Sequence, residues 1–112
     1  MDEQPSYPNV EEVLLQLSSA EGFERDKGNA EKNLKYGVRQ NEIEQIFLNS
    51  PYVVLTDFQH SVEKARWKIF GKTSDGRLLL VVFTIRKKLI RPISARAMNK
   101  KEKHFYEEEI KR

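Results

Sequence analysis

Apolar residues near the start of the chain recur at helical spacing. Four of them fall at i, i+3, i+4 and i+7 behind Asn9, a residue type that caps helix N-termini: Val10, Val13, Leu14 and Leu17. The pattern predicts a short amphipathic helix, with two glutamates near its positive end. It breaks at Gly22, and a short extended piece is expected at residues 23–24.

Two further helices are expected before the main strands. Asp26 is a good N-cap for the first, which runs through Leu34, and Gly37 sits where a left-handed residue would stop it. The second begins at Asn41, where a glutamate three residues later completes a capping-box pattern, and Pro51 ends it. Both helices therefore precede the sheet.

The remaining apolar residues indicate strands. Four segments are rich in β-branched and aromatic residues: 52–56, 66–73, 77–86 and 89–96. Gly76 can take a positive φ in the turn at 74–76, which predicts an antiparallel hairpin between the second and third segments. The run 78–83 is apolar at every position and favours a central strand covered on both faces.

A charged helix is expected to begin near Asn99, with one apolar side made by Met98, Phe105, Tyr106 and Ile110. The predicted fold class is α+β: N-terminal helices, a four-stranded antiparallel meander and a C-terminal helix. We divide the chain into an acidic N-terminal arm and helix, residues 1–22, and a main domain, residues 23–112.

Composition narrows the classes of function. The chain has 112 residues, enough for one core, and no cysteine, which excludes disulfides, thiolate zinc sites and cysteine nucleophiles. No apolar segment is long enough to span a bilayer and the N-terminus is acidic, so we expect a cytoplasmic protein without membrane contact. Glycine-rich phosphate loops, helix-borne histidine pairs and a strained serine elbow are absent, so neither a metal nor another cofactor is predicted.

Charge is unevenly distributed. Residues 1–22 hold five carboxylates and no Lys or Arg, whereas residues 23–112 hold 20 basic and 12 acidic residues, a balance of +8. Residues 86–103 alone carry eight basic residues and one acidic residue. Clustered cations attract polyanions by counterion release, which favours RNA, DNA or an acidic protein as partner.

An ordered set of residues resembles the BrnT family of bacterial toxins. The similarity spans roughly residues 23–108 and rests on Phe23, Glu24, Asp26, Asn29, Asn33, Lys35, Gly37, Val38, Asp57, His60, Arg66, Gly71, Gly76, Arg77, Phe83, Thr84, Arg86, Ser94, Ala95, Arg96, Glu102 and Tyr106. The resemblance implies a ribonuclease with a RelE-like fold that inhibits translation and is neutralised by BrnA, a ribbon-helix-helix antitoxin. A homodimer within such a toxin–antitoxin complex is a further expectation.

Two positions depart from the family pattern. Arg25 stands where members commonly have Trp, and Tyr36 stands where they commonly have His. Both departures favour an alternative: a catalytically inactive module that binds nucleic acid or the antitoxin. A generic basic fold with an unrelated protein partner is a third hypothesis.

Metal-free RNA cleavage needs a base for the 2′-hydroxyl, cationic donors for the phosphorane and an acid for the leaving oxygen. The resemblance places Arg86 and Arg96 at active-site positions, although the two arginines close consecutive strands and are expected some distance apart. Lys100 is the basic residue four beyond Arg96, and His60 is the candidate for proton transfer near neutral pH. Each has the alternative role of a solvated surface residue or a salt-bridge partner.

Other basic residues are expected to contact the RNA backbone: Lys35, Arg66, Arg77, Arg91 and Lys101. Tyr36, Glu102 and Tyr106 are further proton-transfer candidates, equally explained by helix solvation or packing. The antitoxin is expected to cover the same basic surface. The acidic N-terminal helix either masks that surface or, as we favour, docks on the sheet or another subunit.

Overall fold

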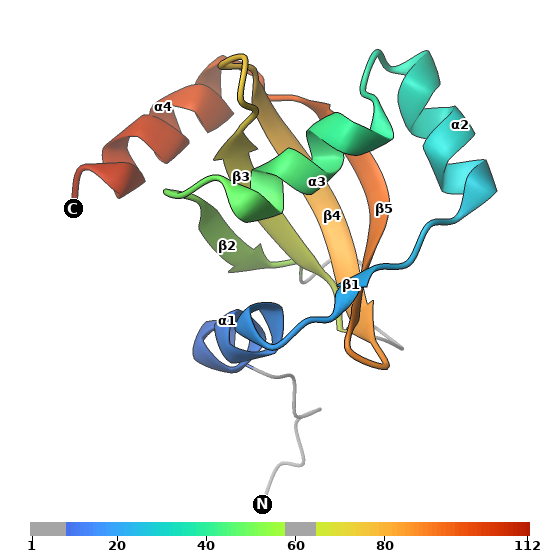
Figure 1. Cartoon of the computed structure of the whole chain (residues 1–112). Helices are drawn as coiled ribbons and strands as arrows, with labels where there is room; N and C mark the ends of the chain where they lie inside the picture. The colour runs from blue at the N-terminus through green and yellow to red at the C-terminus, as the bar shows by residue number, and fades with distance from the viewer. Residues whose placement is uncertain (1–8, 58–64) are drawn as a thin grey trace, which may run out of the picture.

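Helices surround one twisted sheet in the computed structural model, which describes residues 9–57 and 65–112 (Figure 1). The described elements are α1 (Val10–Ser18), β1 (Gly22–Phe23), α2 (Lys27–Lys35), α3 (Gln40–Leu48), β2 (Val53–Thr56), β3 (Trp67–Lys72), β4 (Leu78–Arg86), β5 (Leu89–Ala97) and α4 (Lys100–Ile110). None of the helices in this part of the chain is both long and apolar enough to cross a bilayer.

The α+β class and the C-terminal helix are confirmed, but the expectation of a four-stranded antiparallel sheet is wrong. In the described residues the sheet has five strands in the order β1-β5-β4-β3-β2. The extra strand, β1, pairs in parallel with β5 through Gly22 and Phe23. Its two residues are too few to produce an alternating pattern, so the sequence predicted an extended piece without a partner.

Most predicted helix boundaries follow from side-chain caps. The side chains of Asn9 and Asp26 each accept a backbone N–H of the following turn, as expected, and Asn99, near which the last helix was predicted to begin, does the same. The start of α3 differs: the Glu42 carboxylate accepts the backbone N–H of Arg39 at 3.0 Å, so the helix begins at Gln40. The capping box predicted between Asn41 and Glu44 is not formed, because the Glu44 carboxylate accepts hydrogen bonds from the side chains of Arg25 and Gln40.

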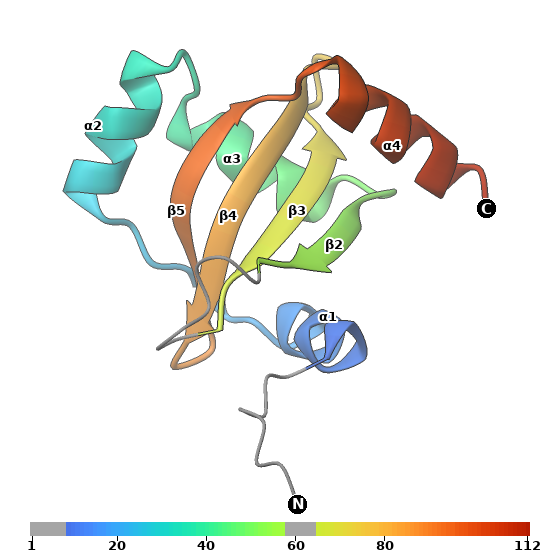
Figure 2. The ribbon, with the colours of Figure 1, turned by 180° about the vertical axis from the view of Figure 1, so that it is seen from behind.

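The two faces of the sheet carry separate apolar clusters. On one face α1 and α3 cover the larger core, which includes Val13, Ile43, Ile46, Trp67, Ile69, Leu79, Val81 and Phe83. On the other face Tyr106 of α4 and Met98, just before that helix, pack against Phe70 and Leu80. In Figure 2 the helix α4 reaches only one end of this second face, while β3, β4 and β5 lie open between α2 and α4.

The N-terminal helix is part of the main core. Val13 is fully buried among residues of the sheet and of α3. Within residues 9–57 and 65–112, Glu11, Glu12 and Glu21 form no ion pair with a basic residue. The structure therefore supports docking of this helix on the sheet over masking of a basic surface.

Candidate functional site

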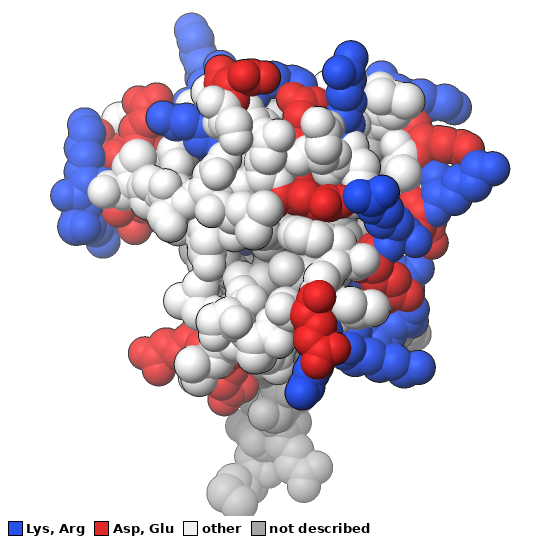
Figure 3. All heavy atoms as spheres, viewed as in Figure 1, with Lys and Arg blue, Asp and Glu red and all other residues white. Residues whose placement is uncertain are grey.

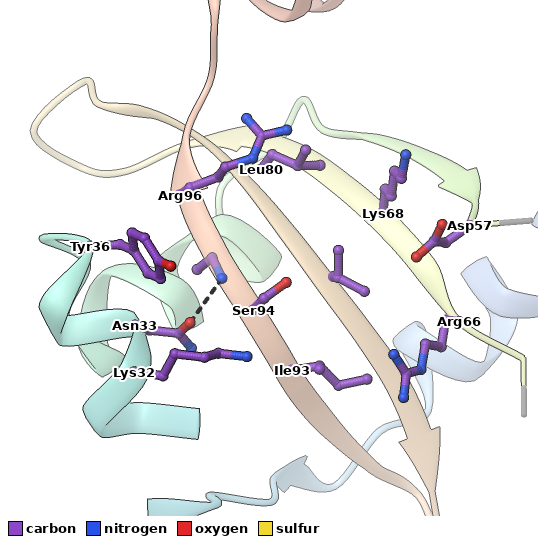
Figure 4. A pocket seen from close by; sticks show the side chains of 12 residues that line it. Lys32, Asn33, Tyr36, Asp57, Arg66, Lys68, Leu80, Ile93, Ser94 and Arg96 are labelled. Atoms are coloured by element: carbon purple, nitrogen blue, oxygen red, sulfur yellow. Dashed lines mark hydrogen bonds between the residues drawn. The ribbon is translucent and has the colours of Figure 1, made fainter. Parts of the chain in front are cut away.

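A basic pocket of about 450 Å³ lies on the open face of the sheet. Its walls come from α2, the end of β2 and strands β3, β4 and β5, as Figure 4 shows. Four of the described lining residues are basic, Lys32, Arg66, Lys68 and Arg96, and one is a carboxylate, Asp57. On the opposite side, which α3 covers, the centre of the surface is largely uncharged and the charged side chains lie toward the margins (Figure 3).

Strand alternation and register place the pocket residues in rows. Trp67 and Ile69 point into the main core, so Lys68 between them points to the open face. Lys68 pairs with Val82, which pairs with Ser94, and these three residues form one row across β3, β4 and β5. The next row ends in Arg96, because Leu80 pairs with that residue.

Helix α2 forms the outer wall of the pocket through a polar contact. In the described part of the chain, β5 has no strand on its outer side beyond its short pairing with β1, and the backbone N–H of Ala95 donates to Asn33 Oδ1 at 3.1 Å. Asn33 is 2% exposed and is the one buried residue of α2. This contact satisfies a sheet-edge donor and holds Lys32 and Tyr36 beside the pocket.

Arg96 is oriented by α4. Its two terminal nitrogens donate to the two carboxylate oxygens of Glu102 at 2.7 and 2.8 Å. The same carboxylate accepts the backbone N–H of Asn99 at 2.9 Å and so completes the capping box of α4. The hydrogen bonds from Arg96 lower the pKa of Glu102, and the carboxylate raises the pKa of Arg96. Lys68 lowers the Glu102 pKa further through its charge.

The two arginines expected at the active site do not share a pocket. Arg96 lines the basic pocket, whereas Arg86 lies six residues beyond Leu80, the partner of Arg96, or roughly 20 Å along β4. Arg86 donates to Glu24 at 2.7 Å and, mainly through this hydrogen bond, lowers the pKa of that carboxyl. It therefore fastens the end of β4 to the segment after β1.

The other expected RNA contacts are dispersed. Arg66 lines the pocket, but Arg91 pairs with Asp26 at 3.1 Å, and Arg77 donates to Glu42 at 2.7 Å and to the Gly37 carbonyl at 3.0 Å. The three lysines predicted as site residues do not line the pocket and are exposed on α2 and α4: Lys35, Lys100 and Lys101. His60 lies outside the described residues.

The structure adds pocket residues that were not among the predicted site residues. Lys68 carried a signal, since it alternates with Trp67 and Ile69 and is two residues from Arg66. The buried Asp57 was among the residues of the family resemblance but was given no role, and Lys32 carried no signal, because its position depends on how α2 meets the sheet.

Cationic donors from separate elements surround one open pocket, an arrangement that suits a phosphate group. In the described residues, no group of three or more histidines, cysteines or carboxylates could hold a metal ion. The Tyr36 ring and the Ser94 hydroxyl complete the polar rim.

No curated protein matches the chain significantly. A family model described as ribonuclease toxin, BrnT, of type II toxin-antitoxin system matches residues 26–102. The match covers well over half of the chain and runs from the N-cap of α2 to the first turn of α4, so it contains every residue that lines the pocket. The chain therefore belongs to the BrnT family of ribonuclease toxins of type II toxin–antitoxin systems.

Proposed function

We propose that the basic pocket binds the RNA backbone and that the chain is an endoribonuclease that cleaves RNA there without a metal ion. One observation carries the proposal: four basic side chains from α2, β3, β5 and the segment before β3 line a single open pocket in a chain of this ribonuclease family. Loss of intact RNA would then inhibit translation, the outcome expected of such a toxin.

The pocket suits cleavage by the neighbouring 2′-hydroxyl. The 2′-oxygen attacks phosphorus and gives up its proton to a base, the P–O5′ bond breaks, and an acid protonates the departing 5′-oxygen. In this proposal Arg96 and Lys68, which line the pocket, stabilise the added charge on the phosphorane oxygens, and Arg96 exchanges a hydrogen bond to Glu102 for one to the phosphate. His60, three residues after Asp57 in the sequence, remains our candidate for proton transfer.

Arg86 supplies a matched control for Arg96. Both are strand arginines that bind one carboxylate at 2.7 Å, and their side chains are 45% and 50% exposed. Only Arg96 lines the pocket. Truncating either arginine breaks an ion pair, with one hydrogen bond at Arg86 and two at Arg96, so thermal unfolding of both variants is needed before a difference in activity is assigned to the pocket.

The test is cleavage of end-labelled single-stranded RNA in the presence of EDTA. Arg96→Ala and Lys68→Ala should each lower the cleavage rate by about 100-fold or more, and Arg86→Ala should leave it within a few-fold. Thermal unfolding of all three variants checks that they are folded. Full activity in Arg96→Ala together with loss in Arg86→Ala would move the site to the other end of β4 and refute the proposal.

A catalytically inactive RNA-binding module is the second candidate. Tyr36 stands at the pocket rim where family members commonly have His, and the described lining contains no histidine. The same assay separates the two candidates, because tight RNA binding without cleavage products supports the binding module.

A type II toxin has a protein antitoxin as partner. We propose that a BrnA-like ribbon-helix-helix protein covers the basic pocket and so blocks RNA directly. Protection of the lysines at positions 32 and 68 from acetylation in the complex would support this arrangement, and unchanged labelling would place the inhibitory contact elsewhere.

A further inference from the structure

The aromatic ring at the rim of the pocket is unusually accessible. Tyr36 is 70% exposed, yet it lines the pocket, and its ring projects from the end of α2 toward β5 beside Arg96 (Figure 4). Packing in the core therefore does not explain why an aromatic residue occupies this position. Leu34, on the same helix, is also exposed, at 58%, but does not line the pocket.

The backbone that carries this ring is held in place. The Tyr36 N–H donates to the carbonyl of Asn33 at 3.0 Å, and Asn33 is itself tied to β5. The next residue, Gly37, has φ +79°, and its carbonyl accepts from Arg77 at 3.0 Å. After it, Val38 is completely buried. An exposed ring on a fixed backbone loses little conformational entropy when it binds a flat ligand.

Two cations line the same pocket as the ring. Lys32 is one helical turn earlier on α2, at the i, i+4 spacing that puts two side chains on one helix face. Arg96 lines the pocket from β5, and its guanidinium is directed away from the ring and held by Glu102. Single-stranded nucleic acid is commonly recognised by aromatic rings that stack on bases, with cations that follow the phosphates.

We propose that Tyr36 stacks on a nucleobase of single-stranded RNA whose adjacent phosphates are held by Lys32 and Arg96. The inference rests on the proposed function and names its substrate class. A base inside a duplex is covered by its neighbours on both faces, so the ring selects unpaired RNA against duplex. Tyr36 thus acts in substrate recognition at a position where the family commonly carries a histidine.

The experiment compares two non-cleavable probes on the full chain: a short 2′-O-methyl oligoadenylate and an abasic sugar–phosphate oligomer of the same length. Tyr36→Ala should weaken binding of the oligoadenylate by about 5- to 150-fold and should leave binding of the abasic oligomer within about 2-fold. Tyr36→Phe, which keeps the ring, and Leu34→Ala, which changes an exposed side chain outside the pocket, should both bind like the wild type.

A spectroscopic signature adds a second readout. Fluorescence of 2-aminopurine in the oligomer should be quenched by the wild type and by Tyr36→Phe, but much less by Tyr36→Ala at saturating protein. Equal losses of affinity for the base-bearing and abasic oligomers would show that Tyr36 acts through the phosphates or the fold, and would overturn the stacking proposal.

The remaining outcomes distinguish this inference from the proposed function. If Tyr36→Ala binds both oligomers like the wild type while RNA cleavage still depends on Arg96, stacking is wrong and the ribonuclease site stands. If the wild type neither binds the oligomers nor cleaves RNA, the proposed function and the stacking inference are both wrong.

Discussion

Replacing Asn33 by alanine should loosen α2 from the sheet. The side chain is 2% exposed, and its Oδ1 is the acceptor for the Ala95 N–H at 3.1 Å on the outer side of β5. A buried backbone donor left without a partner costs about 1–3 kcal/mol, and the small cavity adds to this. We expect a loss of about 2 kcal/mol from a total that is usually about 5–15 kcal/mol.

The assay is thermal and urea unfolding of Asn33→Ala beside the wild type. For a domain of this size about 2 kcal/mol corresponds to a fall in Tm of roughly 10 °C. Leu34→Ala, on the same helix at a residue 58% exposed, is the control and should change stability by less than about 0.5 kcal/mol. RNA affinity should fall together with stability, because α2 carries two pocket residues.

A third variant separates hydrogen bonding from packing. Asn33→Leu fills a similar volume without an acceptor, so it should remain destabilised because the Ala95 N–H is still unpaired. Wild-type stability in Asn33→Leu would show that packing alone holds the helix. A change below about 0.5 kcal/mol in Asn33→Ala would refute the reasoning altogether.

Three further predictions concern charge and the N-terminal helix. The pKa of Glu102 is lower in the folded chain than its ordinary value of 4.5, so the pairing with Arg96 stabilises the fold fully above pH 4.5. This stabilisation is lost as the pH falls through the folded pKa. In urea unfolding, the stability of Glu102→Gln should therefore fall less at acid pH than that of the wild type. Val13→Ala should cost about 2 kcal/mol in unfolding experiments, and Leu15→Ala, at a residue 70% exposed, almost nothing. If the four basic pocket residues each neutralise one phosphate, log K for single-stranded RNA should fall against log salt with a slope of about −3, and a slope near zero would contradict backbone binding.

Local signals in the sequence predicted most of the fold. Asn9, Asp26 and Asn99 act as helix caps because a short polar side chain satisfies a free N–H wherever a helix begins. The turn at Gly76, with φ +88°, likewise follows from one residue type. Among the described strands, β1 was the one missed, because a two-residue pairing with β5 is decided by the tertiary structure.

The site was harder to predict because it depends on distant pairing. Arg96 and Arg66 were identified by resemblance and do share the pocket, but nothing in the sequence reveals that Lys68 lies in the same row as Ser94. Helix α2 illustrates a second limit. Its residue Leu34 is 58% exposed, and the helix is attached to β5 through the side chain of Asn33, a polar attachment that hydrophobic periodicity does not detect.

Ion pairs neutralise much of the positive charge that the described residues carry outside the basic pocket. Four arginines outside it each bind a carboxylate of another segment at 2.7 to 3.1 Å: Arg25, Arg77, Arg86 and Arg91. These pairs neutralise charge locally and fasten α2, α3 and the segment after β1 to their neighbours. In the pocket Arg96 also pairs with a carboxylate, Glu102, but among the described lining residues four basic side chains accompany one carboxylate, Asp57. The sequence fixes how many cations the chain has, and the pairing decides where a polyanion meets an excess of them.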